Sequence, residues 1–236
     1  MGRLGDIALG PFVAAQAAYV SLRVERLPEA AGLRAGEIGN GPPLRLLIVG
    51  DSGAAGVGAR DQSEALSGQL SSRLATDYLV RWRLIARSGE TTSQAVRRLQ
   101  RTPPAAFDIA LVALGINDAK NGIPQARWMK ATRQVITLLH KRFSVREVYY
   151  SGFPPVRELA RLPEPLRGAL SARTLRFDAA LQALLDQTPG THYLPMEFSL
   201  GPEAMASDGV HPGPLMYAQW AALAESAIRR DLQSDG

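Results

Sequence analysis

The stretch Leu44–Gly58, LRLLIVGDSGAAGVG, predicts a buried strand that ends in a serine-bearing, glycine-rich loop. The run from Leu44 to Val49 is short, apolar and partly β-branched, as buried strands are. The glycines that follow permit a tight backbone path. Open α/β sheets place their sites at the carboxyl ends of strands, so Ser52 is a candidate nucleophile. An ordinary turn with a small polar residue is the alternative interpretation of this stretch alone.

Strand and helix patterns alternate through the rest of the chain. Further strands are predicted at 78–86, 108–114, 145–150 and 191–194, and helices at 64–76, 93–101, 125–142, 166–187 and 215–232. This alternation favours a mainly parallel sheet that is covered by helices on both faces. The sequence therefore predicts an α/β protein with five strands.

Composition limits the class of protein. A chain of 236 residues, with 46% hydrophobic and 21% charged residues, is typical of one globular domain and argues against disorder or a multi-span membrane protein. The absence of cysteine excludes disulfides, thiolate nucleophiles and cysteine-ligated metals. The net charge is +5, but the arginines are scattered along helical patterns. We therefore expect no nucleic-acid partner.

Residues 1–43 are predicted to form an amino-terminal amphipathic helix and a linker, ahead of a catalytic domain at 44–236. Apolar and amide side chains recur at roughly helical spacing at Phe12, Val13, Gln16, Tyr19, Val20 and Val24. The helix either packs on the domain or contacts a membrane surface or another subunit. Asp6 precedes the apolar run and Pro11 and Gln16 interrupt it, which argues against a signal peptide. We expect a cytoplasmic protein, with the periplasm or secretion as the alternatives. Residues 35–43, AGEIGNGPP, are the expected linker.

Three predicted strands in succession end in residues that suit one site. Ser52, Gly89 and Asn117 follow these strands, while Asp208 and His211 come late in the chain. A serine hydroxyl is a weak nucleophile until a base takes its proton, and an imidazole, with an unperturbed pKa of about 6.5, can do so. A carboxylate on the other ring nitrogen fixes the tautomer and stabilises the imidazolium. We therefore expect Ser52 as nucleophile, His211 as base and Asp208 as orienting acid.

The negative oxygen that forms on attack needs preorganised donors, and losing one typically costs about 10²–10³ in turnover. The backbone N–H groups of Ser52 and Gly89 and the side-chain amide of Asn117 are the candidates. Gly89 lets a substrate approach its N–H closely because it has no side chain. Asn117 donates without carrying a charge.

At these positions the sequence resembles the GDSL-like, SGNH hydrolase family. Four blocks in the family's order carry the resemblance: Gly50-Asp51-Ser52, Gly89 in SGETT, Gly115-Ile116-Asn117-Asp118 and Asp208-Gly209-Val210-His211-Pro212. The resemblance implies a three-layer α/β/α, flavodoxin-like fold with a mainly parallel five-stranded sheet, and no metal or organic cofactor. It also implies an esterase, lipase, thioesterase or carbohydrate-deacetylase repertoire. Gly53 departs from the pattern, because the family's name-giving leucine would stand there, so we expect the substrate pocket to differ at this position.

Other polar residues have less demanding interpretations. Asp51 adjoins the serine but is expected to fix its loop by hydrogen bonds, and Asp118 to brace the Asn117 turn. His140 lies at the end of a predicted helix, and His192 in a short strand suits packing or the surface. A metal site is conceivable from His192, His211, Asp208 and Glu197. None of these residues has a compact ligand spacing, so we expect no metal.

The sequence thus predicts a serine esterase that acts on a small-molecule carboxylic ester, with a short- to medium-chain acyl group, through an acyl-enzyme intermediate. A carbohydrate O-deacetylase, a thioesterase or a lysophospholipase with the same site is the alternative within the enzyme class. A non-catalytic binding domain is the alternative from another class. The long irregular segments 154–165 and 195–206 are expected to form the pocket walls.

Overall fold

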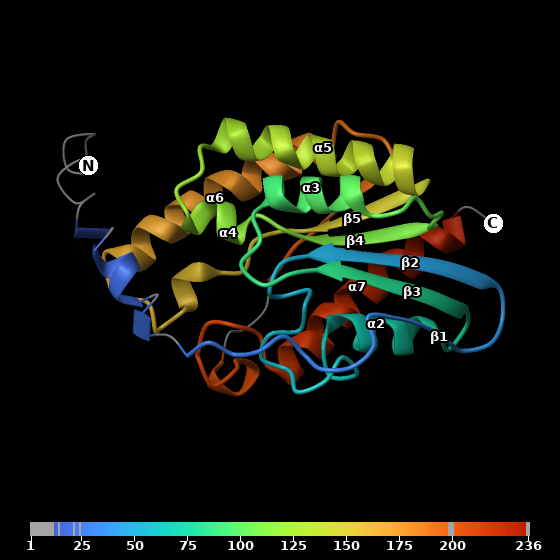
Figure 1. Ribbon diagram of the computed structural model, residues 1–236, viewed down its shortest axis with the longest axis horizontal. Helices are drawn as coiled ribbons and strands as arrows, with labels where there is room; N and C mark the ends of the chain where they lie inside the picture. Colours follow the sequence, from blue (N-terminus) through green and yellow to red (C-terminus); the bar gives the residue numbers. More distant parts are fainter. Residues whose placement is uncertain (1–11, 14, 21, 24, 198–200, 235–236) are drawn as a thin grey trace.

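A six-stranded sheet forms the centre of the computed structural model, which describes residues 12–13, 15–20, 22–23, 25–197 and 201–234 (Figure 1). The strand order is β1-β3-β2-β4-β5-β6, and every pair is parallel except β1 with β3. The strands are β1 (Ala35–Ile38), β2 (Pro43–Gly50), β3 (Leu79–Ala86), β4 (Ile109–Ala113), β5 (Glu147–Ser151) and β6 (Thr191–Leu194). The mixed α/β fold class is confirmed.

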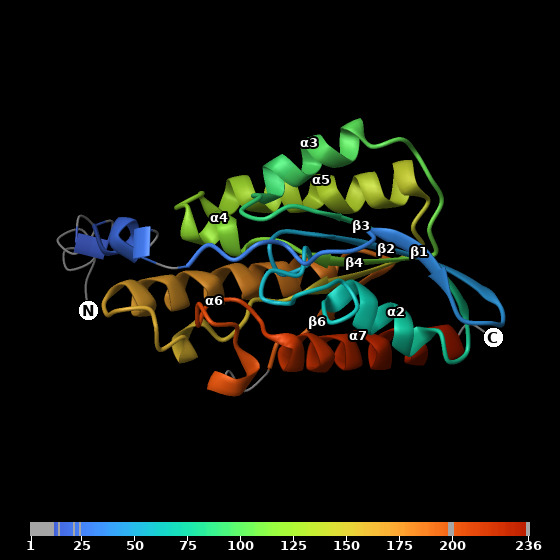
Figure 2. The same cartoon turned by 60° about the horizontal axis from the view of Figure 1, so that its bottom comes forward.

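Helices cover both faces of the sheet, as predicted. The first layer is α2 (Leu66–Leu74) and α7 (Pro214–Ser234). The second is α3 (Thr92–Arg101), α4 (Ile116–Lys120), α5 (Gln125–Phe143) and α6 (Leu166–Leu185). Figure 2 shows α3 and α5 on the opposite side of the sheet from α2 and α7. Two short 3₁₀ turns, Val156–Glu158 and Pro202–Ala204, lie in the long connections.

Strand β2 lies inside the sheet, between β3 and β4, and both of its faces are buried. Leu46 and Ile48 pack into the core under α2 and α7, while Leu47 and Val49 pack into the core under α3 and α5. Alternation of side chains along a strand produces this division, and burial on both faces explains why the strand is apolar without interruption. From β2 the chain goes to β3 on one side and then returns to β4 on the other. The carboxyl end of β2 is thus a topological switch point, where open α/β sheets bind ligands.

The sixth strand, β1, lies in the segment that was predicted to be a linker. Residues 35–38 pair antiparallel with β3, from Ala35 opposite Arg83 to Ile38 opposite Val80. The strand is short, mostly exposed and followed by glycines at 39 and 41 with positive φ. An edge strand of this kind has no buried apolar run, so the linker prediction was wrong here. The five predicted strands are all present.

The amino-terminal helix that was predicted is partly described. Residues 12–13, 15–20 and 22–23 are helical, and Gln16 bonds the Glu164 carbonyl and the Leu166 N–H. Val20 packs against a small apolar cluster that includes Val156 and Met216. Asp6, Pro11 and Val24 lie outside the described residues. The division at residue 43 stays a prediction.

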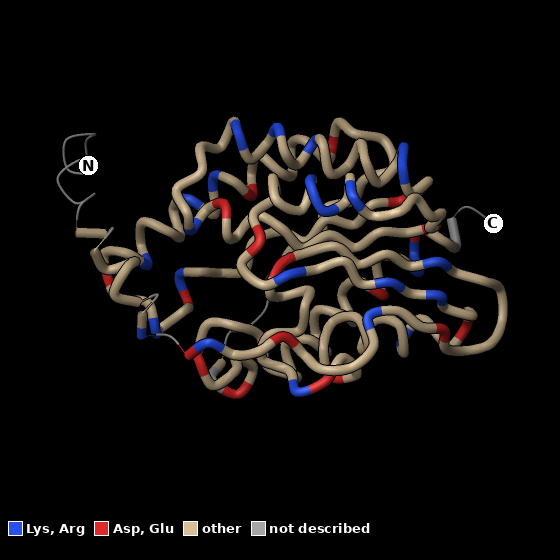
Figure 3. Tube along the Cα trace, viewed as in Figure 1, with Lys and Arg blue, Asp and Glu red and all other residues tan. Residues whose placement is uncertain are grey.

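The described parts of the chain show how the basic residues are distributed and how long and apolar the helices are. Figure 3 shows the lysines and arginines spread over helices and strands. Within the same residues, no helix is both long enough and apolar enough to cross a membrane.

Candidate active site

Ser52, His211 and Asp208 form a connected hydrogen-bonded triad. The His211 Nε2 atom lies 3.1 Å from Ser52 Oγ, and His211 Nδ1 lies 2.5 Å from Asp208 Oδ2. With the proton on Nδ1, the ring donates to the carboxylate and its Nε2 is free to accept the serine proton. The structure therefore brings together the three residues that the sequence predicted for these roles.

A tight turn before α7 supplies both Asp208 and His211. Asp208 Oδ1 accepts the backbone N–H groups of Val210 and His211, at 2.9 and 3.0 Å, while Gly209 between them has a φ of +63°. The side chain of Asp208 is fully buried. Burial acts to raise the pKa of this carboxyl, but the hydrogen bonds from His211 and Val210 hold it below its usual value. Asp208 is thus kept as an anion that faces the imidazole.

Ser52 lies in a tight loop at the end of β2. The Asp51 N–H donates to Ala113 O at 3.1 Å, and the Val57 N–H donates to Ser52 O at 3.0 Å. A Cβ on Gly50 would come within 2.5 Å of the Ala54 side chain, so only glycine fits this turn. The loop holds Ser52 at the switch point of the sheet.

Asp51 braces the loop and does not contact the imidazole. Its Oδ1 accepts the Gly53 N–H at 3.2 Å and its Oδ2 accepts from Asn117 Nδ2 at 3.1 Å. Burial raises the pKa of this carboxyl to about 7, although the bonds from Gly53 and Asn117 and the charge of Lys120 act in the opposite direction. The structural role expected for Asp51 agrees with these contacts.

The two backbone oxyanion candidates are free to donate. Among the described residues, neither the Ser52 N–H nor the Gly89 N–H has a hydrogen-bond acceptor. Gly89 has a φ of +74°, and a Cβ there would meet no atom within 4 Å. The Gly89 position is therefore open on the side where a side chain would stand.

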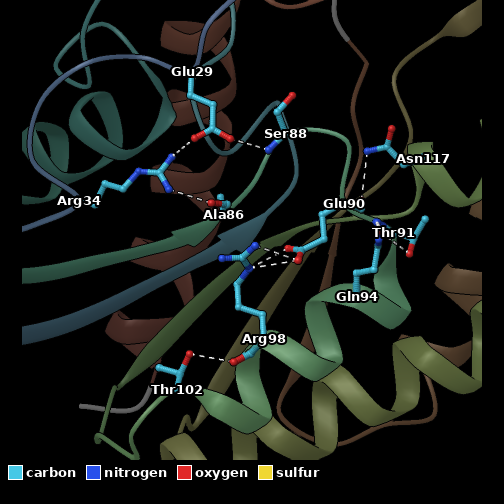
Figure 4. A network of polar contacts seen from close by, with 10 residues as sticks. All are labelled: Glu29, Arg34, Ala86, Ser88, Glu90, Thr91, Gln94, Arg98, Thr102 and Asn117. Carbon is cyan, nitrogen blue, oxygen red and sulfur yellow. Dashed lines mark hydrogen bonds and ion pairs between the residues drawn. The ribbon is translucent and has the colours of Figure 1, made fainter.

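Asn117 is the third oxyanion candidate, and both of its N–H groups are engaged. They donate to Asp51 Oδ2 and, at 3.2 Å, to the carbonyl of Glu90 (Figure 4). Asn117 lies in α4, and the Gly115 before that helix has a φ of +126°; a Cβ there would lie 2.8 Å from the Phe153 ring. Donation from Asn117 to a substrate oxygen thus requires one of its two bonds to be exchanged.

The remaining polar residues take structural partners. Asp118 accepts both the N–H and the hydroxyl of Thr92, at 2.8 Å each, and so joins α4 to the start of α3. His140 contacts the Val145 carbonyl at the end of α5. His192 pairs with Glu147 and stacks on Tyr149, and it does not join His211. Within the part of the chain that the structure describes, no group of three metal-ligating side chains occurs.

A cavity of about 380 Å³ reaches the turn between Asp208 and His211 through Gly209. Its lining includes Leu159 and Arg161 from one long connection and Met205 and Ala206 from the other, together with Gly209. The aliphatic part of Arg161 covers Gly209, where a Cβ would lie 2.5 Å from its Cγ. Both segments predicted as pocket walls thus line this cavity, whose lining includes Gly209 but neither Ser52 nor His211.

Gly53 faces the core and is covered by Trp220. A Cβ on Gly53 would lie 3.3 to 3.4 Å from the six-membered ring of Trp220, which is 5% exposed and bonds Ser151 Oγ through its Nε1. Trp220 on α7 therefore packs where a side chain at position 53 would begin. The expectation that the substrate pocket differs at this position stays a prediction.

Several residues around the site were not predicted from the sequence. Glu90 receives a bidentate ion pair from Arg98, and Glu29 bonds the backbone of Ser88 (Figure 4). The position of Glu90 next to Gly89 was the only signal for the first pair. Nothing in the sequence indicated that Glu29, in the amino-terminal segment, reaches this loop.

Comparison with known proteins places these features in context. The model of the GDSL-like Lipase/Acylhydrolase family matches residues 48–219. No curated protein matches this sequence.

Solved structures share the fold. The chain is similar to the psychrotrophic esterase EstA from Pseudoalteromonas sp., with a TM-score of 0.62 and 18% identity over 80% of this chain and 98% of that one. It is similar to TesA, with a TM-score of 0.57 and 23% identity over 79% of this chain and 98% of that one. It is also similar to a carbohydrate esterase family 2 enzyme from Corynascus thermopiles with its carbohydrate binding domain. That match has a TM-score of 0.60 and 14% identity, and it covers 88% of this chain and 69% of that one.

Proposed function

Because the chain belongs to the GDSL-like Lipase/Acylhydrolase family, we propose that it is a serine esterase that hydrolyses carboxylic esters through an acyl-enzyme on Ser52. The observation that carries the proposal is the continuous path from Ser52 Oγ through the His211 ring to Asp208, at 3.1 and 2.5 Å. A base within hydrogen-bond reach of the nucleophile, itself oriented by a buried carboxylate, is the arrangement that acyl transfer needs.

The proposed reaction has two halves. Ser52 Oγ attacks the ester carbonyl carbon as its proton passes to His211 Nε2. The tetrahedral intermediate places its negative oxygen toward the N–H groups of Ser52 and Gly89 and toward Asn117 Nδ2, which exchanges one of its two bonds to donate. The carbon–oxygen bond to the alcohol then breaks, and His211 returns the proton to the leaving oxygen. In the second half His211 takes a proton from water as the water oxygen bonds to the acyl carbon. The bond from that carbon to Ser52 Oγ then breaks, His211 returns the proton to Oγ, and the carboxylic acid leaves.

The cavity that reaches Gly209, between Asp208 and His211, supports an acyl chain of short to medium length as the group bound. Its wall contains Leu159, Ala160, Met205 and Ala206 together with Glu158, Arg161 and Ser207, and its volume of about 380 Å³ is that of a small ligand site. The apolar part of this wall gains free energy by excluding water from an alkyl chain, and there it leaves sugar hydroxyls without partners. We therefore place acyl esters ahead of acetylated carbohydrates.

Covalent labelling tests the proposal. A fluorophosphonate probe should label the wild-type chain at Ser52, and Ser52→Ala should remove both labelling and hydrolysis of p-nitrophenyl esters while leaving the thermal midpoint within a few degrees. A panel of acetyl, butyryl, octanoyl, acyl-CoA and acetylated-sugar substrates then separates the esterase from its alternatives. Turnover that persists in Ser52→Ala would rule out this nucleophile. Absence of labelling in folded wild-type protein would favour a non-catalytic domain.

A further inference from the structure

Residues 25–34, here called the strap, cross the loops that carry the proposed catalytic groups. The strap has no helix or strand apart from a single bridge residue, Ala31, and it leads into β1 at the edge of the sheet. It lies ahead of residues 48–219, which the family model matches. Any function that the strap has is therefore additional to what the family match describes.

The strap is joined to the nucleophile loop by backbone hydrogen bonds. Ala30 N–H donates to Ala55 O at 3.2 Å, and Ala31 exchanges bonds with Arg60 O and Gln62 N–H at 3.1 and 2.8 Å. The buried Gln62 side chain donates to the carbonyls of Ala30 and Ala55, at 3.2 and 3.1 Å. These contacts fix the strap relative to the loop that bears Ser52.

The strap also forms hydrogen bonds next to and within the oxyanion loop, defined here as residues 87–90. The Ser88 N–H donates to Glu29 Oε1 at 2.6 Å, a short charge-assisted bond. Arg34 donates through Nη2 to Glu29 Oε2 and through Nη1 to Ala86 O, both at 2.8 Å (Figure 4). The Glu29–Arg34 pair therefore holds the backbone on both sides of Arg87.

The other end of the oxyanion loop is held by α3 and α4. Arg98 donates three bonds of 3.0 to 3.1 Å to the Glu90 carboxylate, and Asn117 Nδ2 donates to the Glu90 carbonyl. Gly89 lies between Ser88 and Glu90, and nothing packs where its side chain would be. Glycine has the widest backbone freedom of any residue, so the direction of its N–H depends on these flanking anchors.

We propose that Glu29, held by Arg34, is a positioning residue that fixes the Gly89 N–H in its oxyanion-binding direction. This inference rests on the proposed function. The pair is about one-third exposed, so its contribution to global stability is small, because exposed ion pairs contribute little. Its effect falls on preorganisation, since a donor aids the reaction only when it is aimed at the oxygen as charge develops.

Steady-state kinetics of full-length variants test this role. In Glu29→Ala the Ser88 N–H loses its acceptor, and kcat on a p-nitrophenyl ester should fall about 10- to 100-fold, somewhat less than removal of an oxyanion donor costs, with KM changed less than about twofold. Glu29→Gln keeps an oxygen acceptor and should stay within about threefold of wild type. Arg34→Met frees Glu29 and should give an intermediate loss of kcat.

Inhibition by an alkylboronic acid gives a second readout, because its tetrahedral serine adduct carries an oxygen where the oxyanion develops. In Glu29→Ala its Ki should rise by the same factor by which kcat/KM falls. A general loosening of the structure would not link the two values in this way.

Glu37→Ala is the matched control. Glu37 on β1 pairs with Arg81 at the opposite end of β3, so its loss removes a comparable ion pair far from residues 87–90. Its kcat should equal that of wild type.

The proposal is overturned if Glu29→Ala keeps kcat within twofold of wild type, if only KM changes, or if Glu37→Ala loses as much. Failure of the proposed function is distinguished by the wild type itself, which would then show neither ester turnover nor fluorophosphonate labelling. If Glu29→Ala does not fold, Glu29→Gln and Arg34→Met decide, and the proposal fails if Arg34→Met retains full kcat.

Discussion

Asn117 and Asp51 are joined by a buried hydrogen bond of 3.1 Å, from the amide Nδ2 to the carboxyl Oδ2. The bond links the loop after β2 to the helix after β4, next to the proposed nucleophile. Because the second N–H of Asn117 donates to Glu90, this one side chain connects three loops of the site. Its removal therefore affects both charge stabilisation and loop position.

Asn117→Ala should lower kcat on p-nitrophenyl esters by about 10²-fold or more, as loss of an oxyanion donor does. KM should change much less, because the donor acts mainly on the charge that develops in the transition state. Steady-state kinetics on the purified variant give both values. Equal losses in binding and turnover would instead assign Asn117 to substrate binding.

Asp51 should make the folded protein less stable as pH rises from about 4 to 7. The folded-state pKa of about 7 lies above the ordinary 3.8, so the unfolded chain releases this proton first. The stability that the protonated carboxyl contributes is complete below pH 4 and is lost as pH passes 7. The free energy of unfolding that is lost amounts to at most about 4 kcal/mol, because each unit of pKa difference corresponds to about 1.4 kcal/mol.

Urea unfolding of wild type and Asp51→Asn at pH 5 and pH 8 checks this expectation, because the amide does not titrate. The free energy of unfolding should fall more in the wild type than in the variant over this range. Parallel changes in both proteins would show that Asp51 ionises normally in the fold.

Asp208→Asn should reduce kcat by as much as about 10⁴-fold, because an amide at this position no longer favours the proton on His211 Nδ1. Protein folding should be retained, since the amide oxygen can still accept from the turn. Asp178→Asn is the control, because that carboxylate accepts from Tyr193 and Phe153, away from His211. A similar loss in both variants would contradict a specific role for Asp208.

Substitutions at Gly53 should destabilise the protein in proportion to side-chain size. Gly53→Ala needs the Trp220 ring to shift by a few tenths of an ångström, whereas Gly53→Leu overpacks the site and should cost about 1–3 kcal/mol. Adding Trp220→Leu to Gly53→Leu should cost less than the sum of the single changes. Additive free energies of unfolding would show that Trp220 does not occupy the space of the missing leucine side chain.

The parts of this protein that sequence predicts best are those with a repeating physical signal. Strand β2 was predicted because burial on both faces demands an unbroken apolar run. Ser52, Asp208 and His211 were predicted because acyl transfer requires those residue types and their blocks occur in a known order. Here the chemistry itself restricts the sequence.

Residues that act through distant backbone were not predictable. β1 carries no apolar alternation because it is an exposed edge strand. Glu29 reaches Ser88 across 59 positions of sequence, and any exposed glutamate would look the same. The engagement of both Asn117 N–H groups depends on how α4 is placed against β2, which no local pattern encodes.

The separation of 159 positions between Ser52 and His211 has a consequence for how the protein acquires activity. The sheet can assemble from segments that are closer in sequence, but the triad is complete only when the turn before α7 docks on the β2 loop. During refolding, recovery of far-ultraviolet ellipticity should therefore precede recovery of ester turnover. The rate at which ester turnover returns should therefore report how fast the turn before α7 docks on the β2 loop.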